Sequence, residues 1–193
     1  FGFAVASIRY RLAPEHPHPA QIHDVKAAIR FVRANAETYG FDPNRIAVFG
    51  GSAGGHLAAL AGTSANRPEL TDRSLGNPDV DESVQAVVDW YGPIWVDRTA
   101  QDFESLRVYT DAQQAASREE WLCALLQCTP EELPEKAAAF SPAAYITKDC
   151  PPFLIQHGTA DTTVPILQSI DFDKVLSDVI GEEKVTLDLL HNQ

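Results

Sequence analysis

Short apolar runs alternate with segments of helical periodicity along most of this sequence. The apolar runs stand at residues 3–8, 46–49, 84–89, 153–156 and 185–190. Between two of them, apolar residues recur at spacings of three and four, as in Ile22, Val25, Ile29 and Val32. Strands that alternate with helices are typical of a parallel sheet covered by helices. The sequence therefore predicts an α/β fold, with a mostly parallel sheet and helices on both of its faces.

Residues 97–141 interrupt this alternation. They are polar and helical in pattern and contain no strand-like run, so we expect a helical, cap-like insertion there. The 193 residues have the length of one domain. However, strand-like runs stand at both ends of the chain, and domains rarely begin or end within a sheet. The prediction is a single partial domain over residues 1–193 that lacks N-terminal strands of its sheet.

The charge balance limits the partners of the chain. It carries 15 Lys and Arg against 27 Asp and Glu, a formal net charge of −12, which repels phosphate backbones and anionic lipid. We therefore expect no nucleic-acid partner and no membrane partner. No basic and apolar leader is visible, so a cytoplasmic location is the default expectation. A homo-oligomer is also allowed, because the open flank of the first strand could pair with a second copy.

The pattern Gly-x-Ser-x-Gly at residues 50–54 is the strongest chemical signal. It stands between a strand-like run and a helix-like segment, where a sharp turn lifts a serine hydroxyl clear of the backbone. This context makes Ser52 a candidate nucleophile and the amide of Ala53 a candidate oxyanion donor. A glycine-rich turn with an incidental serine, or a phosphate-binding loop, is the alternative. A phosphate loop would need Lys followed by Ser or Thr after its last glycine, whereas His56 follows here.

A nucleophilic serine needs a histidine, and the histidine needs a carboxylate. Asp161 follows the fourth strand-like run, where the acid of such a sheet belongs, although a turn or capping role is also open to it. Asp89, at the end of the third run, is the second candidate acid. Because the chain order in this kind of sheet is serine, acid, histidine, only His191 lies far enough along to be the base. The same order excludes His157, which we expect to be a buried, hydrogen-bonded residue at a strand end.

Four segments carry a resemblance to a known superfamily, and they stand at residues 10–20, 50–57, 89–93 and 157–161. Together they resemble the α/β-hydrolases, in particular the hormone-sensitive-lipase-like carboxylesterases and the bacterial feruloyl and acetyl-xylan esterases. The resemblance implies Ser52 as nucleophile, Ala53 as oxyanion donor and Asp161 as triad acid. The family's His-Gly-Gly oxyanion segment would precede Phe1. Its catalytic histidine usually lies a few residues beyond the last strand, so that the resemblance places the base just after Gln193 rather than at His191.

The resemblance implies a serine carboxylic-ester hydrolase that acts through an acyl-enzyme on small or carbohydrate-linked esters. It implies no metal and no cofactor, and the spacing of Cys123, Cys128 and Cys150 matches no zinc or redox motif. Two alternatives remain: a serine peptidase similar to prolyl oligopeptidase, and a catalytically silent hydrolase remnant that serves as a binding module. The segment at residues 10–20 favours the esterase over the peptidase.

Overall fold

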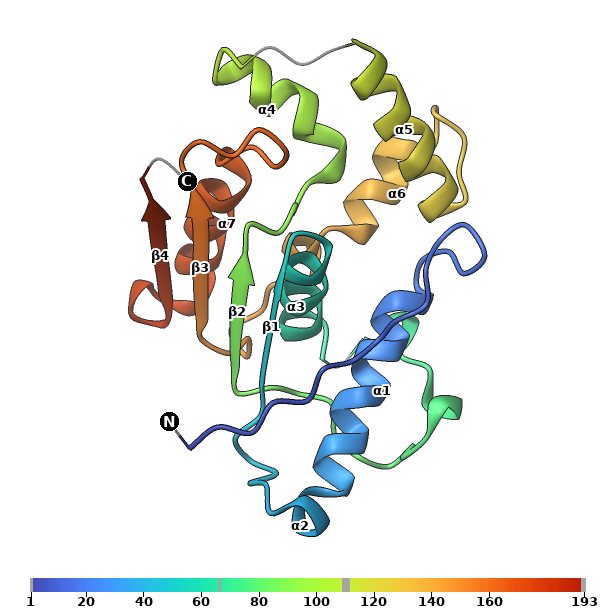
Figure 1. Cartoon of the computed structure of the whole chain (residues 1–193), viewed down its shortest axis with the longest axis vertical. Coiled ribbons are helices and arrows are strands. Elements are labelled where there is room, and N and C mark those ends of the chain that lie inside the picture. Colours follow the sequence, from blue (N-terminus) through green and yellow to red (C-terminus); the bar gives the residue numbers. More distant parts are fainter. Residues whose placement is uncertain (1, 66, 109–111, 192–193) are drawn as a thin grey trace.

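A four-stranded parallel sheet forms the centre of the computed structural model, which describes residues 2–65, 67–108 and 112–191 (Figure 1). Its strands are β1 (Ala47–Gly51), β2 (Ala86–Trp90), β3 (Phe153–Gly158) and β4 (Val185–Leu190), in the spatial order β1-β2-β3-β4. All three pairings are parallel. The predicted parallel α/β architecture and four of the five predicted strands are thus confirmed.

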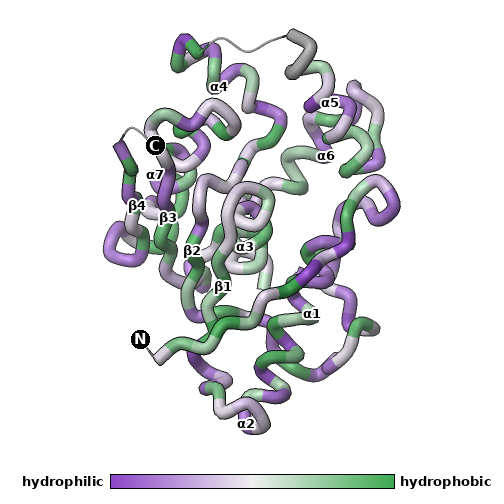
Figure 2. The backbone as a smooth tube through the Cα atoms, viewed as in Figure 1, coloured by the Kyte–Doolittle hydropathy of each residue, from purple (hydrophilic) through white to green (hydrophobic). Residues whose placement is uncertain are grey.

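The helices of the described chain are α1 (Ala20–Ala34), α2 (Ala36–Tyr39), α3 (Ala53–Thr63), α4 (Thr99–Ser105), α5 (Ala112–Leu126), α6 (Leu133–Phe140) and α7 (Leu167–Ile180). Short 3₁₀ turns stand between several of them. The hydropathy colouring in Figure 2 shows apolar stretches along β1, β2 and β3. None of the helices in the described part of the chain is both long enough and apolar enough to span a membrane.

The segment at residues 3–8 is not a strand, which corrects the sequence-based expectation. It runs as an extended chain in which Phe3 is 89% and Val5 72% exposed. A strand exists only where its backbone groups pair with a neighbour. Within the described residues the sheet ends at β1, and nothing pairs with residues 3–8. The apolar run at residues 3–8 therefore has the pattern of a strand, but it does not form one because no described strand pairs with it.

Helices α3 and α7, which pack against the strands, lie on the same face of the sheet, whereas the sequence predicted helices on both faces. Phe153 on β3 packs against Phe172 of α7, with ring centroids 5.8 Å apart, and its ring also approaches Gly62 of α3. Because the side chain of Phe153 points to only one face of the sheet, α3 and α7 lie on the same face. The strand order explains this placement: every crossover advances in the same direction, and right-handed crossovers then put α3 and α7 on the same side. On the opposite face, Phe49 and Trp90 remain partly exposed.

Helices α4, α5 and α6 follow β2, in the part of the chain where the sequence predicts a helical, cap-like insertion over residues 97–141 (Figure 1). They lie above the carboxyl ends of the strands. The first part of this helical segment is anchored by Gln168 of α7, whose buried amide accepts hydrogen bonds from the backbone of Ile94 and Trp95 and contacts Asp102. Its second part is anchored at α5, where the amide of His18 donates to the carbonyl of Leu125 at 2.8 Å.

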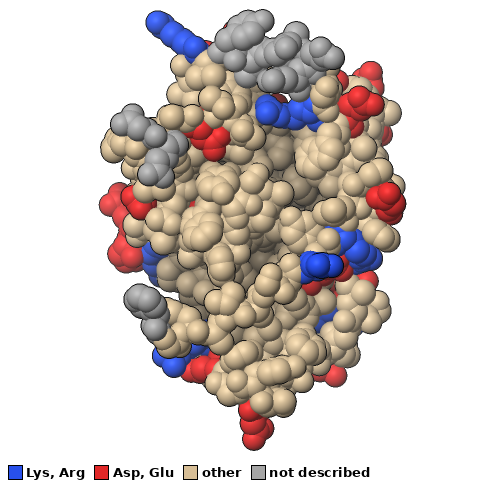
Figure 3. Space-filling view, viewed as in Figure 1, with Lys and Arg blue, Asp and Glu red and all other residues tan. Residues whose placement is uncertain are grey.

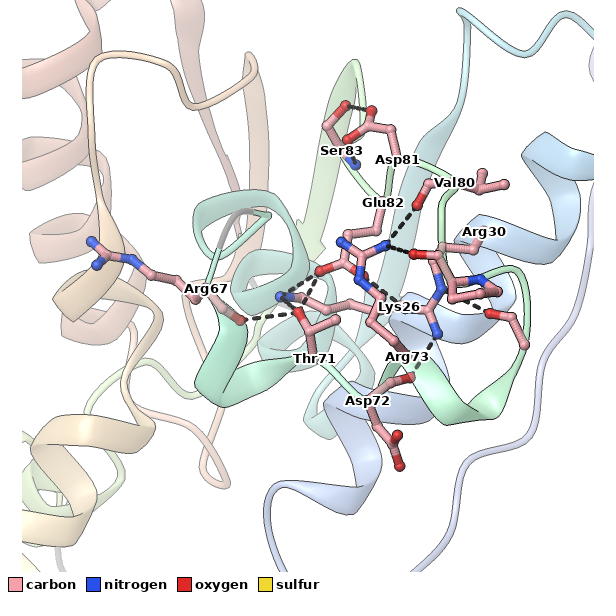
Figure 4. A network of polar contacts seen from close by, with 12 residues as sticks. Lys26, Arg30, Arg67, Thr71, Asp72, Arg73, Val80, Asp81, Glu82 and Ser83 are labelled. Atoms are coloured by element: carbon pink, nitrogen blue, oxygen red, sulfur yellow. Dashed lines mark hydrogen bonds and ion pairs between the residues drawn. The ribbon is translucent and has the colours of Figure 1, made fainter.

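A buried ion cluster fixes the long loop before β2 to α1 (Figure 4). The carboxylate of Glu82 lies 3.2 Å from Lys26 Nζ and 2.7 Å from Arg30 Nη1, and all three side chains are at most 1% exposed. Thr71 donates its hydroxyl hydrogen bond to the same carboxylate at 2.5 Å. Buried charges are tolerated only when they are paired and hydrogen-bonded, so this cluster holds loop and helix in one arrangement.

Candidate active site

Ser52 occupies a strained turn between β1 and α3. Its backbone has φ 54° and ψ −121°, a conformation that non-glycine residues rarely adopt and that is retained mainly at functional sites. The amide of Ser52 donates to the carbonyl of Trp90 at 2.9 Å, which ties the turn to the end of β2. The predicted strand, turn and helix around Ser52 are therefore present, as the nucleophile pattern requires.

The two glycines of the motif differ in their roles. A Cβ atom at Gly50 would lie 2.5 Å from the backbone of Gly54, so residue 50 must be glycine for the turn to close. A Cβ atom at Gly54 would meet nothing within 4 Å, so packing does not explain that second glycine. Ala53 is the first residue of α3, and the amides of a helix's first turn have no partner within the helix. Free amides there, at the positive end of the helix dipole, suit an oxyanion.

A pocket of about 200 Å³ opens at Ser52. It is lined by Ser52, Ala53, Pro93, Val96, Thr99, Arg118, Trp121, Leu122, Thr163 and Val164. These residues come from the Ser52 turn, the segment after β2, helices α4 and α5, and the loop after β3. Figure 3 shows one face of the molecule, on which acidic and basic side chains both lie mostly around the rim and the hollowed centre carries few charges.

Asp161 lies in the loop after β3 with its carboxylate held by backbone amides. Its Oδ1 atom accepts hydrogen bonds from Thr163 at 2.7 Å and Val164 at 3.0 Å. The residues that hold it thus line the same pocket as Ser52. Its Oδ2 atom lies 3.5 Å from His157 Nε2. Among the described residues, no backbone amide donates to Oδ2.

His157 is the buried, hydrogen-bonded strand-end histidine that the sequence predicted. Its side chain is fully buried, its Nδ1 lies 2.7 Å from Ser169 Oγ and its Nε2 lies 3.0 Å from the carbonyl oxygen of Val164. Because a carbonyl can only accept, Nε2 carries the proton and Nδ1 accepts from the Ser169 hydroxyl. Burial lowers the pKa of His157, so the neutral ring is favoured. Both ring nitrogens are therefore occupied.

Asp89, the second candidate acid, lies beneath the Ser52 turn and does not line its pocket. The side chain is fully buried, and its Oδ1 accepts a hydrogen bond from Gly92 at 2.8 Å. Burial raises the pKa of Asp89 to about 6, although the hydrogen bond from Gly92 opposes the shift. Gly55 of α3 must be glycine, because a Cβ atom there would collide with Asp89 Oδ1. The structure assigns Asp89 to the packing of α3 against β2.

His56, which follows the Gly-x-Ser-x-Gly motif, is buried in the first turns of α3. It is 2% exposed, its Nδ1 lies 2.7 Å from the carbonyl oxygen of Pro93, and its ring stacks on Phe140 of α6. Burial lowers the pKa of His56 to about 4. His18 packs edge-on against the same ring, with centroids 4.9 Å apart. These two histidines therefore form an uncharged platform beneath the helical segment.

His191 directly follows β4 and its side chain is exposed. The carbonyl of its neighbour Leu190 accepts a hydrogen bond from Thr159 at 2.9 Å, so this end of β4 lies beside the loop that carries Asp161. Among the described residues, however, no hydrogen bond or ion pair joins His191 to Asp161. The structure thus brings His191 near the candidate acid's loop without forming the contact that a catalytic pair requires.

Sequence reasoning missed two residues of the pocket, Arg118 and Trp121. They lie three positions apart, so they share one face of α5. That helical spacing was the only available signal, because nothing in the sequence of residues 97–141 shows which face of a helix would meet Ser52.

Comparison with known proteins places this geometry in a family. The sequence model described as BD-FAE matches residues 1–176. The chain belongs to the BD-FAE family. Esterase LipC from Mycobacterium tuberculosis is 40% identical over 172 residues, which is 89% of this chain and 40% of that protein. The chain thus spans about 40% of the length of this relative.

Solved structures resemble this BD-FAE member in fold. A truncated carbohydrate esterase from gut microbiota has a TM-score of 0.77 and 34% identity, and the match covers 96% of this chain and 64% of that one. An acetyl ester-xyloside bifunctional hydrolase from Caldicellulosiruptor lactoaceticus has a TM-score of 0.66 and 28% identity. This match covers 94% of this chain and 58% of that one. LipC and the gut-microbiota protein are named as esterases and the third relative as an acetyl ester-xyloside hydrolase, and none of the three is named as a peptidase.

Proposed function

We propose that this chain carries the nucleophile and the acid of a serine carboxylic-ester hydrolase. The observation that supports it most directly is the backbone of Ser52, held at φ 54° between a strand and a helix at the mouth of a pocket. With ψ at −121°, this conformation also lies outside the left-handed helical region, and holding a serine in it costs about 1–3 kcal/mol. The esterase names of the relatives point the same way.

The chemistry follows from the placement of the residues. Ser52 Oγ attacks the ester carbonyl carbon and gives its proton to a histidine that Asp161 orients. The amide of Ala53 stabilises the negative charge that develops on the carbonyl oxygen. The bond to the alcohol then breaks, and the histidine returns the proton to the departing oxygen. Water hydrolyses the acyl-enzyme by the same steps, with the histidine as base. No metal or cofactor takes part in this scheme.

The size of the pocket supports small acyl groups. Its volume of about 200 Å³ is below the range of roughly 300–1,000 Å³ that is usual for drug-sized ligands. Short acyl chains, such as acetyl, fit this volume, and the alcohol can extend outward. We propose small esters and esters of carbohydrates as the substrate class, which the carbohydrate and acetyl-ester activities in the names of the structural relatives also favour. In this proposal the helical insertion at residues 97–141 acts as a cap that bounds the acyl site.

The test is hydrolysis of 4-nitrophenyl acetate by the protein at its full natural length. We expect Ser52→Ala to reduce kcat by at least about 10⁴-fold, since the nucleophile is lost. Alanine makes the same backbone demand as serine at positive φ, so the variant keeps the turn. Retention of activity in Ser52→Ala would refute the proposal.

His191 is the candidate base among the residues of this chain. A fall in kcat of about 10⁴-fold in His191→Ala would assign proton transfer to it. An unchanged kcat would assign the transfer to another histidine. The absence of a contact between His191 and Asp161 makes this variant the necessary companion to Ser52→Ala.

A further inference from the structure

Arg118 places a positive charge in the pocket of the candidate nucleophile. It lies on α5, lines the pocket together with Ser52, and is half-buried. Its Nη2 atom donates to the carbonyl oxygen of Thr163 at 3.4 Å, a long hydrogen bond. Arginine has five N–H donors in a rigid fork, so most of its donors remain for a ligand.

No carboxylate neutralises Arg118 within the described residues. The ion pairs found in that part of the chain involve other arginines and lysines. Asp161 belongs to the loop that Arg118 touches, but its Oδ1 is occupied by the amides of Thr163 and Val164, and no hydrogen bond or ion pair joins it to Arg118 in the described part of the chain. A guanidinium in the pocket wall that has no counter-ion among the described residues favours an anionic ligand.

The surroundings of Arg118 strengthen such an interaction. Pro93, Val96, Leu122 and Val164 make much of the pocket wall apolar, and hydrogen bonds to charged groups are stronger where water is excluded. Trp121 lies one helical turn from Arg118 on the same wall and is 53% exposed, so its ring offers a flat apolar surface beside the charge. The chain as a whole is acidic, with a net charge of −12. Arg118 is therefore a positive charge in the pocket of an acidic chain, and a neutral substrate would leave that charge unpaired.

We propose that the pocket at Ser52 accepts esters whose short acyl chain ends in a carboxylate, the half-esters of small dicarboxylic acids. The carboxylate binds Arg118, the methylene chain packs on Trp121, and the ester carbonyl lies at Ser52. This inference rests on the proposed esterase function and narrows its substrate class. The alcohol is not restricted by this arrangement.

The experiment compares two methyl esters of equal acyl length in the full-length protein: monomethyl glutarate, which is anionic, and methyl pentanoate, which is neutral. Proton release gives kcat/KM for each. We expect the ratio of anionic to neutral ester to fall by about tenfold or more in Arg118→Gln, which is the size of one hydrogen bond to a charged group. In Arg118→Glu the preference should reverse. Arg45→Gln, a variant of an 82% exposed arginine on the loop before β1, is the matched control and should keep the ratio.

Each outcome separates this inference from the esterase proposal. Turnover of methyl pentanoate with an equal ratio in wild type and Arg118→Gln overturns the inference and leaves the esterase function standing. If neither ester is cleaved, the esterase proposal fails. The anion site at Arg118 is then tested by measuring the binding of glutarate by calorimetry. Binding that is lost in Arg118→Gln supports an anion site at Arg118, whereas no binding, or equal binding in both proteins, overturns it.

Discussion

The carboxylate of Asp89 accepts a hydrogen bond from the amide of Gly92 at 2.8 Å, while its other oxygen, Oδ2, is buried without a hydrogen-bond partner among the described residues. Oδ1 of the same carboxylate packs against Gly55 in the first turn of α3. One ionisable group thus lies beneath the helix whose N-terminus carries Ser52. Because a buried carboxylate is costly when charged, this contact links the packing of the elbow to pH.

Replacement of Asp89 by asparagine should remove a pH dependence of stability. The pKa of Asp89 rises from 3.8 to about 6 on folding, so the native state holds the proton more tightly than the unfolded chain. Its contribution to stability therefore falls by about 2 kcal/mol between pH 4 and pH 7. Relative to Asp89→Asn, the wild type should lose this amount over that range in urea unfolding. Asp149→Asn, at an exposed position, is the control, and a pH-independent difference between wild type and Asp89→Asn would contradict the prediction.

The histidines beneath the helical segment should act in the opposite direction. Burial lowers the pKa of His18 from 6.5 to about 4, and the neighbouring His56 and His23 contribute. A folded pKa below the unfolded one means that stability is lost as pH falls from 6.5 towards 4. His18→Phe keeps the ring on Phe140 and removes the titration, so between pH 7 and pH 5 it should lose about 1–2 kcal/mol less stability than the wild type.

The control for this second prediction is His16→Phe, since His16 lies on the same loop and is exposed. It should follow the wild-type pH dependence. If His18→Phe and His16→Phe show the same dependence in denaturant unfolding, the buried position of His18 has no part in acid stability.

Removal of the central anion of the buried ion cluster should destabilise the protein strongly. Glu82→Gln leaves Lys26 and Arg30 buried without a counter-ion, and the expected loss is about 3–5 kcal/mol in the free energy of unfolding. Glu69→Gln, at an exposed position on the same loop, should change the stability by less than about 0.5 kcal/mol. A loss of similar size in both variants would show that the cluster does not anchor the loop to α1.

Asp161→Asn separates the chemical role of the carboxylate from its role in the loop. The asparagine oxygen can still accept the amides of Thr163 and Val164, so the loop geometry is kept. The charge that orients a catalytic histidine is lost, and kcat should fall by about 10⁴-fold with little change in stability. Asp178→Asn, at an exposed ion pair on α7, is the matched control for kcat. If Asp161→Asn keeps kcat within tenfold of wild type, Asp161 is a turn residue only.

The sequence predicted those parts of the fold in which local pattern and tertiary structure agree. The strands after residue 46, the turn at Ser52 and the loop of Asp161 all follow from short-range patterns of apolar residues, glycine and turn residues. Residues 3–8 have the pattern of a strand without a partner, and pairing is a non-local property. The single covered face follows from strand order, which no local pattern contains.

The same distinction applies to the candidate site. Ser52 and Asp161 are predicted from the sequence because motif and position along the chain point to them. Arg118 and Trp121 were missed because their place in the pocket depends on how α5 lies over the sheet. The burial of His56 and the raised pKa of Asp89 depend on contacts with Phe140, Pro93 and Gly92 that are distant in sequence or set by a turn.

The most direct test of the central claim is the intact mass of the protein after exposure to a fluorophosphonate probe. Such a probe forms a covalent bond to a serine only when its hydroxyl is activated. The account predicts one adduct, and peptide mapping should place it on Ser52. The adduct should be absent from Ser52→Ala. It should persist in the control Ser105→Ala, which changes an exposed serine on α4. No adduct on the wild-type protein, or an adduct at another serine, would contradict it.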